Sequence, residues 1–123
     1  MARTRVIFLG EDPKDPLQHA AADYLARAGK KLDATLAPLP ATRRGKGNDD
    51  ASVKEDEATR LLAGSAGCTR VALDPLGTVL ASSEELARDL EKLMQRGKPL
   101  AFLIGGATGL APRVLAELSL IHI

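Results

Sequence analysis

The sequence has few aromatic residues: no tryptophan, one tyrosine and two phenylalanines. RNA-binding modules that stack bases on exposed aromatic rings need several such side chains. The single cysteine, Cys68, cannot form an intramolecular disulfide, and no Cys/His cluster has the spacing of metal ligands. These shortages argue against an aromatic RNA platform, a disulfide-stabilised domain and a metal site.

Long apolar runs are also missing. The run near the start, Val6 to Leu9, is too short for a signal peptide or a membrane-spanning segment. We therefore expect a cytoplasmic protein with no membrane partner. With 123 residues, 45% of them hydrophobic, the sequence predicts one soluble domain over residues 1–123.

Charge is distributed unevenly, although the formal net charge is only +1. Residues 1–47 carry nine Lys/Arg and five Asp/Glu, whereas residues 48–123 carry eight and eleven. This asymmetry is compatible with a local anion-binding face in the first part of the chain and argues against a generally basic DNA-binding coat.

Short apolar runs alternate with helix-like segments along the chain. Strands are predicted at residues 6–9, 32–39, 71–73 and 100–104. Helices are predicted after the caps Asp15, Ser52 and Ser82 and from Pro112, with stops at Gly29, Gly64 and Gly97. Strands separated by helices predict an α/β fold, a parallel sheet with helices on both faces.

Two segments leave predicted strand ends, where ligands settle in such sheets. Gly105 and Gly106 follow a buried strand, and a tight turn and a ligand cradle are equal alternatives for them. In Leu73–Gly77, Asp74 before Pro75 favours simple turn chemistry. Leu73 itself stands where a wall for an aromatic ring would be placed.

The loop residues Arg43, Arg44 and Lys46 place three cations within four positions, alternating with glycine. Such a loop can follow a phosphate backbone, although for an isolated basic run a solvated surface loop is the favoured interpretation. No Ser-His-Asp or Cys-His arrangement and no convincing carboxylate pair accompanies it, so no catalytic residue is predicted from these patterns.

Five segments change this interpretation when they are taken in order: Pro40–Gly47 (PATRRGKG), Lys54–Glu57 (KEDE), Ala72–Gly77 (ALDPLG), Ser82–Glu85 (SSEE) and Phe102–Leu110 (FLIGGATGL). Their order and spacing resemble the large-subunit rRNA pseudouridine N3-methyltransferases known as the RlmH family, small members of the SPOUT superfamily. The similarity extends from the start of the chain to Leu120, and the third and fifth segments together are its most specific part.

This resemblance implies a SPOUT-like, Rossmann-like domain that binds S-adenosylmethionine in three strand-end loops. Leu73 matches the first contact, and Gly106, with Gly105 beside it, matches the second. The loop cations Arg43, Arg44 and Lys46 would hold large-subunit rRNA by its phosphates. The resemblance also implies no metal and, for the full-length family, a homodimer whose contacts come from its C-terminal tail.

The third cofactor loop follows Leu118–Leu120 in the family, and a C-terminal tail then forms a trefoil knot and supplies the expected catalytic groups. Here the sequence gives Ile121, His122 and Ile123 and ends. We therefore expect a C-terminally truncated chain without the knot segment, with weak cofactor binding and no turnover. Sequencing the gene beyond the codon for Ile123 tests this expectation.

Two other hypotheses stay open at this stage. A non-enzymatic nucleotide- or RNA-binding module would bind RNA in a salt-sensitive way without responding to S-adenosylmethionine. A structural or regulatory α/β domain would use both glycine segments only as turns, so that Gly106→Ala would change stability alone.

Overall fold

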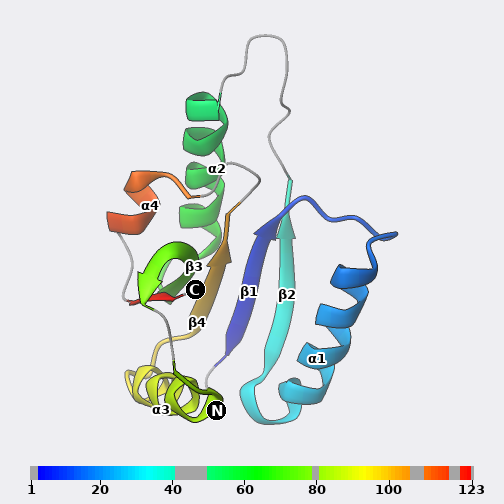
Figure 1. Cartoon of the computed structure of the whole chain (residues 1–123), viewed down its shortest axis with the longest axis vertical. Helices are drawn as coiled ribbons and strands as arrows, with labels where there is room; N and C mark the ends of the chain where they lie inside the picture. Colours follow the sequence, from blue (N-terminus) through cyan, green and yellow to red (C-terminus); the bar gives the residue numbers. More distant parts are fainter. Residues whose placement is uncertain (1–2, 41–49, 79–80, 106–109, 117–119, 123) are drawn as a thin grey trace.

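The structure is a computed structural model that describes residues 3–40, 50–78, 81–105, 110–116 and 120–122. Its five strands form one sheet in the order β2-β1-β4-β3-β5, and every neighbouring pair is parallel. The strands are β1 (Thr4–Leu9), β2 (Ala34–Leu39), β3 (Thr69–Thr78), β4 (Leu100–Ile104) and β5 (Leu120–His122). The predicted parallel α/β sheet is confirmed (Figure 1).

Helices cover both faces of this sheet, as predicted. They are α1 (Pro16–Leu32), α2 (Asp50–Gly64), α3 (Ser83–Met94) and α4 (Pro112–Ala116). Helices α2 and α4 pack on one face, where Leu61 and Val114 join a core with Ile7 and Leu103. Helix α3 packs on the other face through Leu93. None of the described helices has the length and apolar character needed to cross a bilayer.

The central strand β4 shows how the sequence divides between the two faces. Ala101 and Leu103 belong to the core under α2 and α4, whereas Leu100 and Phe102 contact the cluster under α3. Successive side chains of a strand point to opposite faces, so a continuous apolar run is what a strand buried on both sides requires. The same residues were predicted as a strand for this reason.

Local helix signals were confirmed where a side chain caps its own helix. Asp15 Oδ1 accepts a hydrogen bond from Leu17 N at 2.9 Å, and Ser82 Oγ accepts one from Glu85 N at 3.2 Å. Gly97, with φ of 77°, follows the end of α3.

Two predicted helix limits were wrong. Helix α1 passes through Gly29 and ends at Leu32, and Asp33 takes the left-handed conformation, with φ of 49°. Helix α2 begins at Asp50, so Ser52 lies inside its first turn and is not the N-cap. Glycine lowers helix propensity by only about 1 kcal/mol, which is too little to stop a helix by itself.

Strand β3 and the C-terminal segment also differ from prediction. We expected β3 to end at Leu73 and Asp74 to begin a turn, but the strand continues to Thr78, with irregular register between Leu73 and Thr78. Strand β5 was not predicted at all. It pairs with β3, and pairing to a neighbouring strand stabilises an extended segment too short to be recognised from its own pattern.

Helix α2 is attached at its C-terminus to β3. Ser65, which is fully buried, donates from Oγ to Leu61 O at 2.7 Å and accepts from Arg70 Nε at 2.7 Å. Arg70 also donates from Nη2 to Leu62 O at 3.0 Å. The last carbonyls of a helix lack partners within the helix, so these bonds satisfy them and fix α2 against the strand that leads to Leu73.

We predict that Ser65→Ala lowers the free energy of unfolding by about 1–2 kcal/mol, because Arg70 loses a buried acceptor. Urea denaturation followed by circular dichroism measures the change. Ser83→Ala, at an exposed position of α3, is the control and should change stability by less than about 0.5 kcal/mol. An equal effect of both variants would contradict the assigned role of Ser65.

Candidate cofactor site at the carboxyl edge of the sheet

The site is built on the register between β3 and β4. Leu73 pairs with Ile104, and Gly105 follows Ile104 directly, so Leu73 and Gly105 lie side by side at the carboxyl edge of the sheet. Val71 and Ala72 are fully buried, but Leu73 is 41% exposed. The strand therefore leaves its core at Leu73 and presents an apolar side chain at the edge where ligands bind in parallel sheets.

A third strand reaches the same edge. Strand β5 lies beside β3, with His122 paired to Leu73. Leu73 therefore lies between Ile104 and His122, the last residues of β4 and β5, and Figure 1 shows the β3 and β5 segments side by side. Two strand ends on either side of Leu73 provide the arrangement of a site formed by several loops.

The structure brings together two of the residues named from the sequence, Leu73 and Gly105. Gly106 and the basic loop residues Arg43, Arg44 and Lys46 lie outside the described residues. The side chain of Asp74 is also outside them.

Helix α4, which follows the glycine segment, is held by contacts that the sequence patterns did not indicate. Arg113 donates from Nη2 to Thr59 Oγ1 at 2.8 Å and to Glu55 O at 3.1 Å, and its Nε lies 3.2 Å from Glu55 Oε2. Leu110 and Ala111 are buried against the same core as α2. These contacts join α4 to α2 and so fix the far end of the segment that begins at Gly105.

A buried carboxylate on α2 was also missed. Glu57 is 4% exposed and lies between the buried positions Val53 and Leu61, and its Oε1 has no hydrogen-bond partner within the described part of the chain. Carboxylates are rarely buried without a partner, because desolvation of the charge is costly. Only burial distinguishes Glu57 from the other acids of its helix, and burial cannot be seen in a single sequence.

The chemistry of this edge fits a small ligand with an apolar ring. Leu73 offers an apolar side chain, and Gly105 has no Cβ to keep a ligand from its backbone. Among the residues that the structure describes, no group of three or more His, Cys, Asp or Glu side chains could hold a metal ion. Leu73 and Gly105 thus offer an apolar contact and an approachable backbone, and no described residue beside them has an assigned acid–base role.

Comparison with known proteins identifies the fold family. Residues 2–121 match the family model described as a predicted SPOUT methyltransferase. The chain belongs to the SPOUT methyltransferase family. It is also 36% identical over 120 residues to "Ribosomal RNA large subunit methyltransferase H" of Thioalkalivibrio sulfidiphilus, covering 97% of this chain and 76% of that protein.

Two further relatives carry the same name. The protein of Stenotrophomonas maltophilia is 38% identical over 115 residues, covering 93% of this chain and 73% of the relative. That of Thiobacillus denitrificans is 37% identical with the same coverage. The resemblance to the SPOUT family and to RlmH inferred from the sequence is thereby confirmed.

We predict that Glu57→Gln raises the free energy of unfolding at neutral pH by about 1 kcal/mol, since a buried amide costs less to desolvate than a buried carboxylate. Urea denaturation measures this difference. Glu91→Gln, at an exposed position of α3, is the control. A loss of stability in the Glu57 variant alone would show that its carboxylate has a partner in the folded protein.

Proposed function

We propose that this SPOUT protein, expressed from its gene to the natural stop codon, transfers a methyl group from S-adenosylmethionine to N3 of a pseudouridine in large-subunit rRNA. The observation that carries the proposal is the register that places Leu73 beside Ile104 and Gly105, at the positions that the RlmH resemblance assigns to the cofactor. The names of the relatives support rRNA of the large subunit as the substrate. The proposal includes a cytoplasmic location and, as the resemblance implies for the full-length family, a homodimer.

In this proposal each described residue has a positioning role. Leu73 packs against the adenine ring, and Gly105, with Gly106 after it, lets the backbone approach the bound molecule. The bonds from Arg113 to Thr59 and Glu55 keep α4 in place beyond the glycine segment. Arg43, Arg44 and Lys46 hold RNA by its phosphates, which positions the substrate without reading its bases.

The reaction sets two requirements. S-adenosylmethionine supplies a methyl group already activated by its sulfonium, so the protein must hold the target nitrogen close to that carbon and in line with it. The N3 of pseudouridine must also lose a proton before it can act as a nucleophile. The described residues address the first requirement, and the proposal assigns no proton acceptor among them.

The cofactor assignment predicts where the protein responds to S-adenosylhomocysteine. In a titration followed by backbone amide chemical shifts, the largest changes should lie at the carboxyl ends of β3 and β4. Leu73→Asp should raise the dissociation constant about tenfold or more, because it removes one buried apolar contact. This method measures weak as well as tight binding, so low affinity does not prevent the test.

Leu17→Asp is the matched control, since Leu17 is 78% exposed on α1 and lies outside the proposed site. Gly106→Ala should also weaken binding at little cost to folding. The assignment would be contradicted by shifts centred on α1, or by equal affinity of the Leu73 and Leu17 variants.

The reaction itself is tested with large ribosomal subunits from a bacterium whose own enzyme has been deleted. The protein, expressed from its gene to the natural stop codon, should transfer labelled methyl groups from S-adenosylmethionine to the rRNA. Mass spectrometry of the digested nucleosides should identify 3-methylpseudouridine. Salt-sensitive RNA binding without transfer would favour the non-enzymatic RNA-binding module, and a different methylated nucleoside would contradict the proposed specificity.

A further inference from the structure

A group of cations lies at the amino edge of the sheet, the end opposite to Leu73. Arg3 precedes β1, and its carbonyl accepts a hydrogen bond from Leu100 N at 2.8 Å. Pro99, whose carbonyl accepts from Thr69 N at 2.8 Å, connects this point to Lys98. The start of β1 and the segment entering β4 are therefore adjacent, and they bring Arg3 and Lys98 to the same edge.

The register extends this basic edge across the sheet. Arg5 pairs with Thr35 on one side and with Ala101 on the other, and Ala101 pairs with Arg70. These four residues form one row on one face of the sheet. Beside Arg5 is an open pocket of about 300 Å³, lined by Arg3, Thr4, Arg5, Asp33 and Thr35. Two arginines, two threonines and one aspartate thus line one hollow.

Like Arg27 and Arg88, the exposed cations of this edge have no carboxylate or capping partner in the described chain, and they lie together at one end of the sheet. Arg113 and Arg60 pair with carboxylates, and Arg70 caps α2. We define the amino-edge surface as Arg3, Arg5, Arg96 and Lys98, which are exposed and form no ion pair with any described residue.

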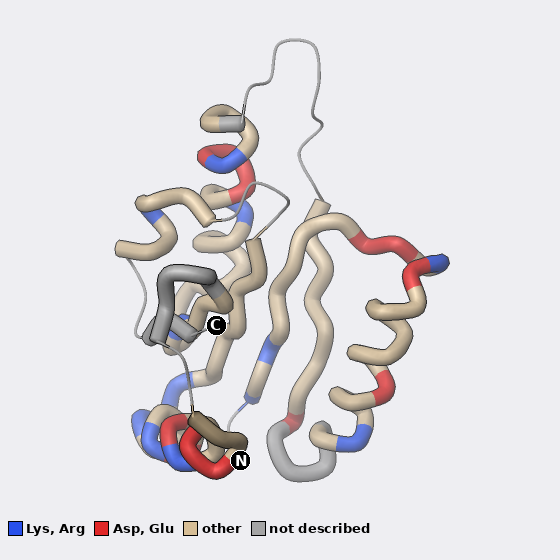
Figure 2. The backbone as a smooth tube through the Cα atoms, in the orientation of Figure 1, with Lys and Arg blue, Asp and Glu red and all other residues tan. Residues whose placement is uncertain are grey.

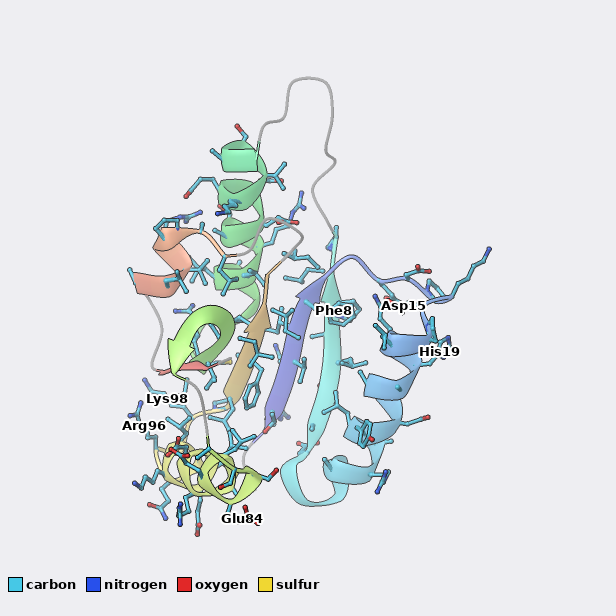
Figure 3. All side chains as sticks on the ribbon, viewed as in Figure 1. Phe8, Asp15, His19, Glu84, Arg96 and Lys98 are labelled. Carbon is cyan, nitrogen blue, oxygen red and sulfur yellow. The ribbon has the colours of Figure 1, made fainter. Side chains whose placement is uncertain are left out.

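Acidic groups also lie near the amino-edge surface. Asp33 is the only carboxylate that lines the pocket. Helix α3 carries four acids, Glu84, Glu85, Asp89 and Glu91, against the two cations Arg88 and Lys92, and Arg96 and Lys98 follow its end. Figure 2 shows the charges near the lower end of the sheet, and Figure 3 shows Arg96 and Lys98 together, with Glu84 apart from them.

We propose that the amino-edge surface is a second contact for the phosphates of the rRNA substrate. This inference rests on the proposed function, because it takes rRNA as the partner. Exposed guanidinium, ammonium and hydroxyl groups without an apolar anchor fit a phosphate backbone better than a protein interface, whose core is apolar. Strand β1 has six residues and spans about 20 Å, so the surface contacts RNA well away from the nucleotide at the carboxyl edge.

The test is the salt dependence of binding to a fluorescein-labelled stem-loop of large-subunit rRNA, followed by fluorescence anisotropy. Each phosphate contact contributes about 0.7–0.9 to the slope of log affinity against log salt. For Arg5→Gln/Lys98→Gln, the slope should fall in magnitude by about 1.5, because two cations no longer bind phosphates, and affinity at low salt should fall with it. The double variant should keep the circular dichroism spectrum of the wild type because both side chains are exposed.

Lys14→Gln/Arg27→Gln removes the same charge from exposed positions before and on α1, and it should leave the slope unchanged. Equal slopes for the two double variants would overturn the amino-edge contact, as would an absence of RNA binding by the wild type. The wild type is also tested with polyglutamate. If it binds polyglutamate as tightly as the RNA stem-loop, and the Arg5/Lys98 variant loses affinity equally for both, RNA would be overturned as the partner. If RNA binding depends on the amino-edge surface but no methyl group is transferred, the amino-edge contact would be supported and only the proposed function would be refuted.

Discussion

The parallel register of β3 and β4 is the constraint on which the rest of the site depends. Because Leu73 lies opposite Ile104, the last residue of β4, the apolar side chain of Leu73 and the glycine after β4 share one edge. A shift of one residue would turn Leu73 to the other face of the sheet and separate it from this edge. Burial of Val71, Ala72 and Leu103 sets this register, so the core determines the geometry of the site.

Helix α2 packs on the core and also contacts the segments around that edge. Ser65 and Arg70 attach its C-terminus to β3, and Arg113 attaches α4 to its exposed side. Arg60 donates from Nη1 to Pro40 O at 2.8 Å, immediately before the basic loop. Both the basic loop and the helix after the glycine segment therefore start from points fixed to one helix, although they are more than sixty residues apart in the chain.

The predictions from sequence were reliable where the determining interaction was local or strongly periodic. Asp15 and Ser82 cap their own helices, and the apolar run of β4 is buried on both faces. Gly29 did not end α1, because a single glycine lowers helix stability too little to stop the helix. Strand β5 forms through its pairing with β3. The proximity of Leu73 to Gly105 followed from parallel topology, but Arg113 and the buried Glu57 depend on packing between distant elements.

The polarity of a parallel sheet gives its two edges different physical roles. At the carboxyl edge, Leu73 and Gly105 provide an apolar and closely approachable surface, suited to a small molecule that must be held in one orientation. At the amino edge, Arg3, Arg5 and Lys98 provide charge that acts over several ångströms and tolerates variable geometry. A ligand that uses both edges must be long and anionic, whereas the reacting group must be compact. An RNA whose phosphates bind at one edge while a single nucleotide enters the other meets both conditions. In that arrangement the amino edge supplies affinity for the substrate, and the carboxyl edge supplies the positioning that methyl transfer requires.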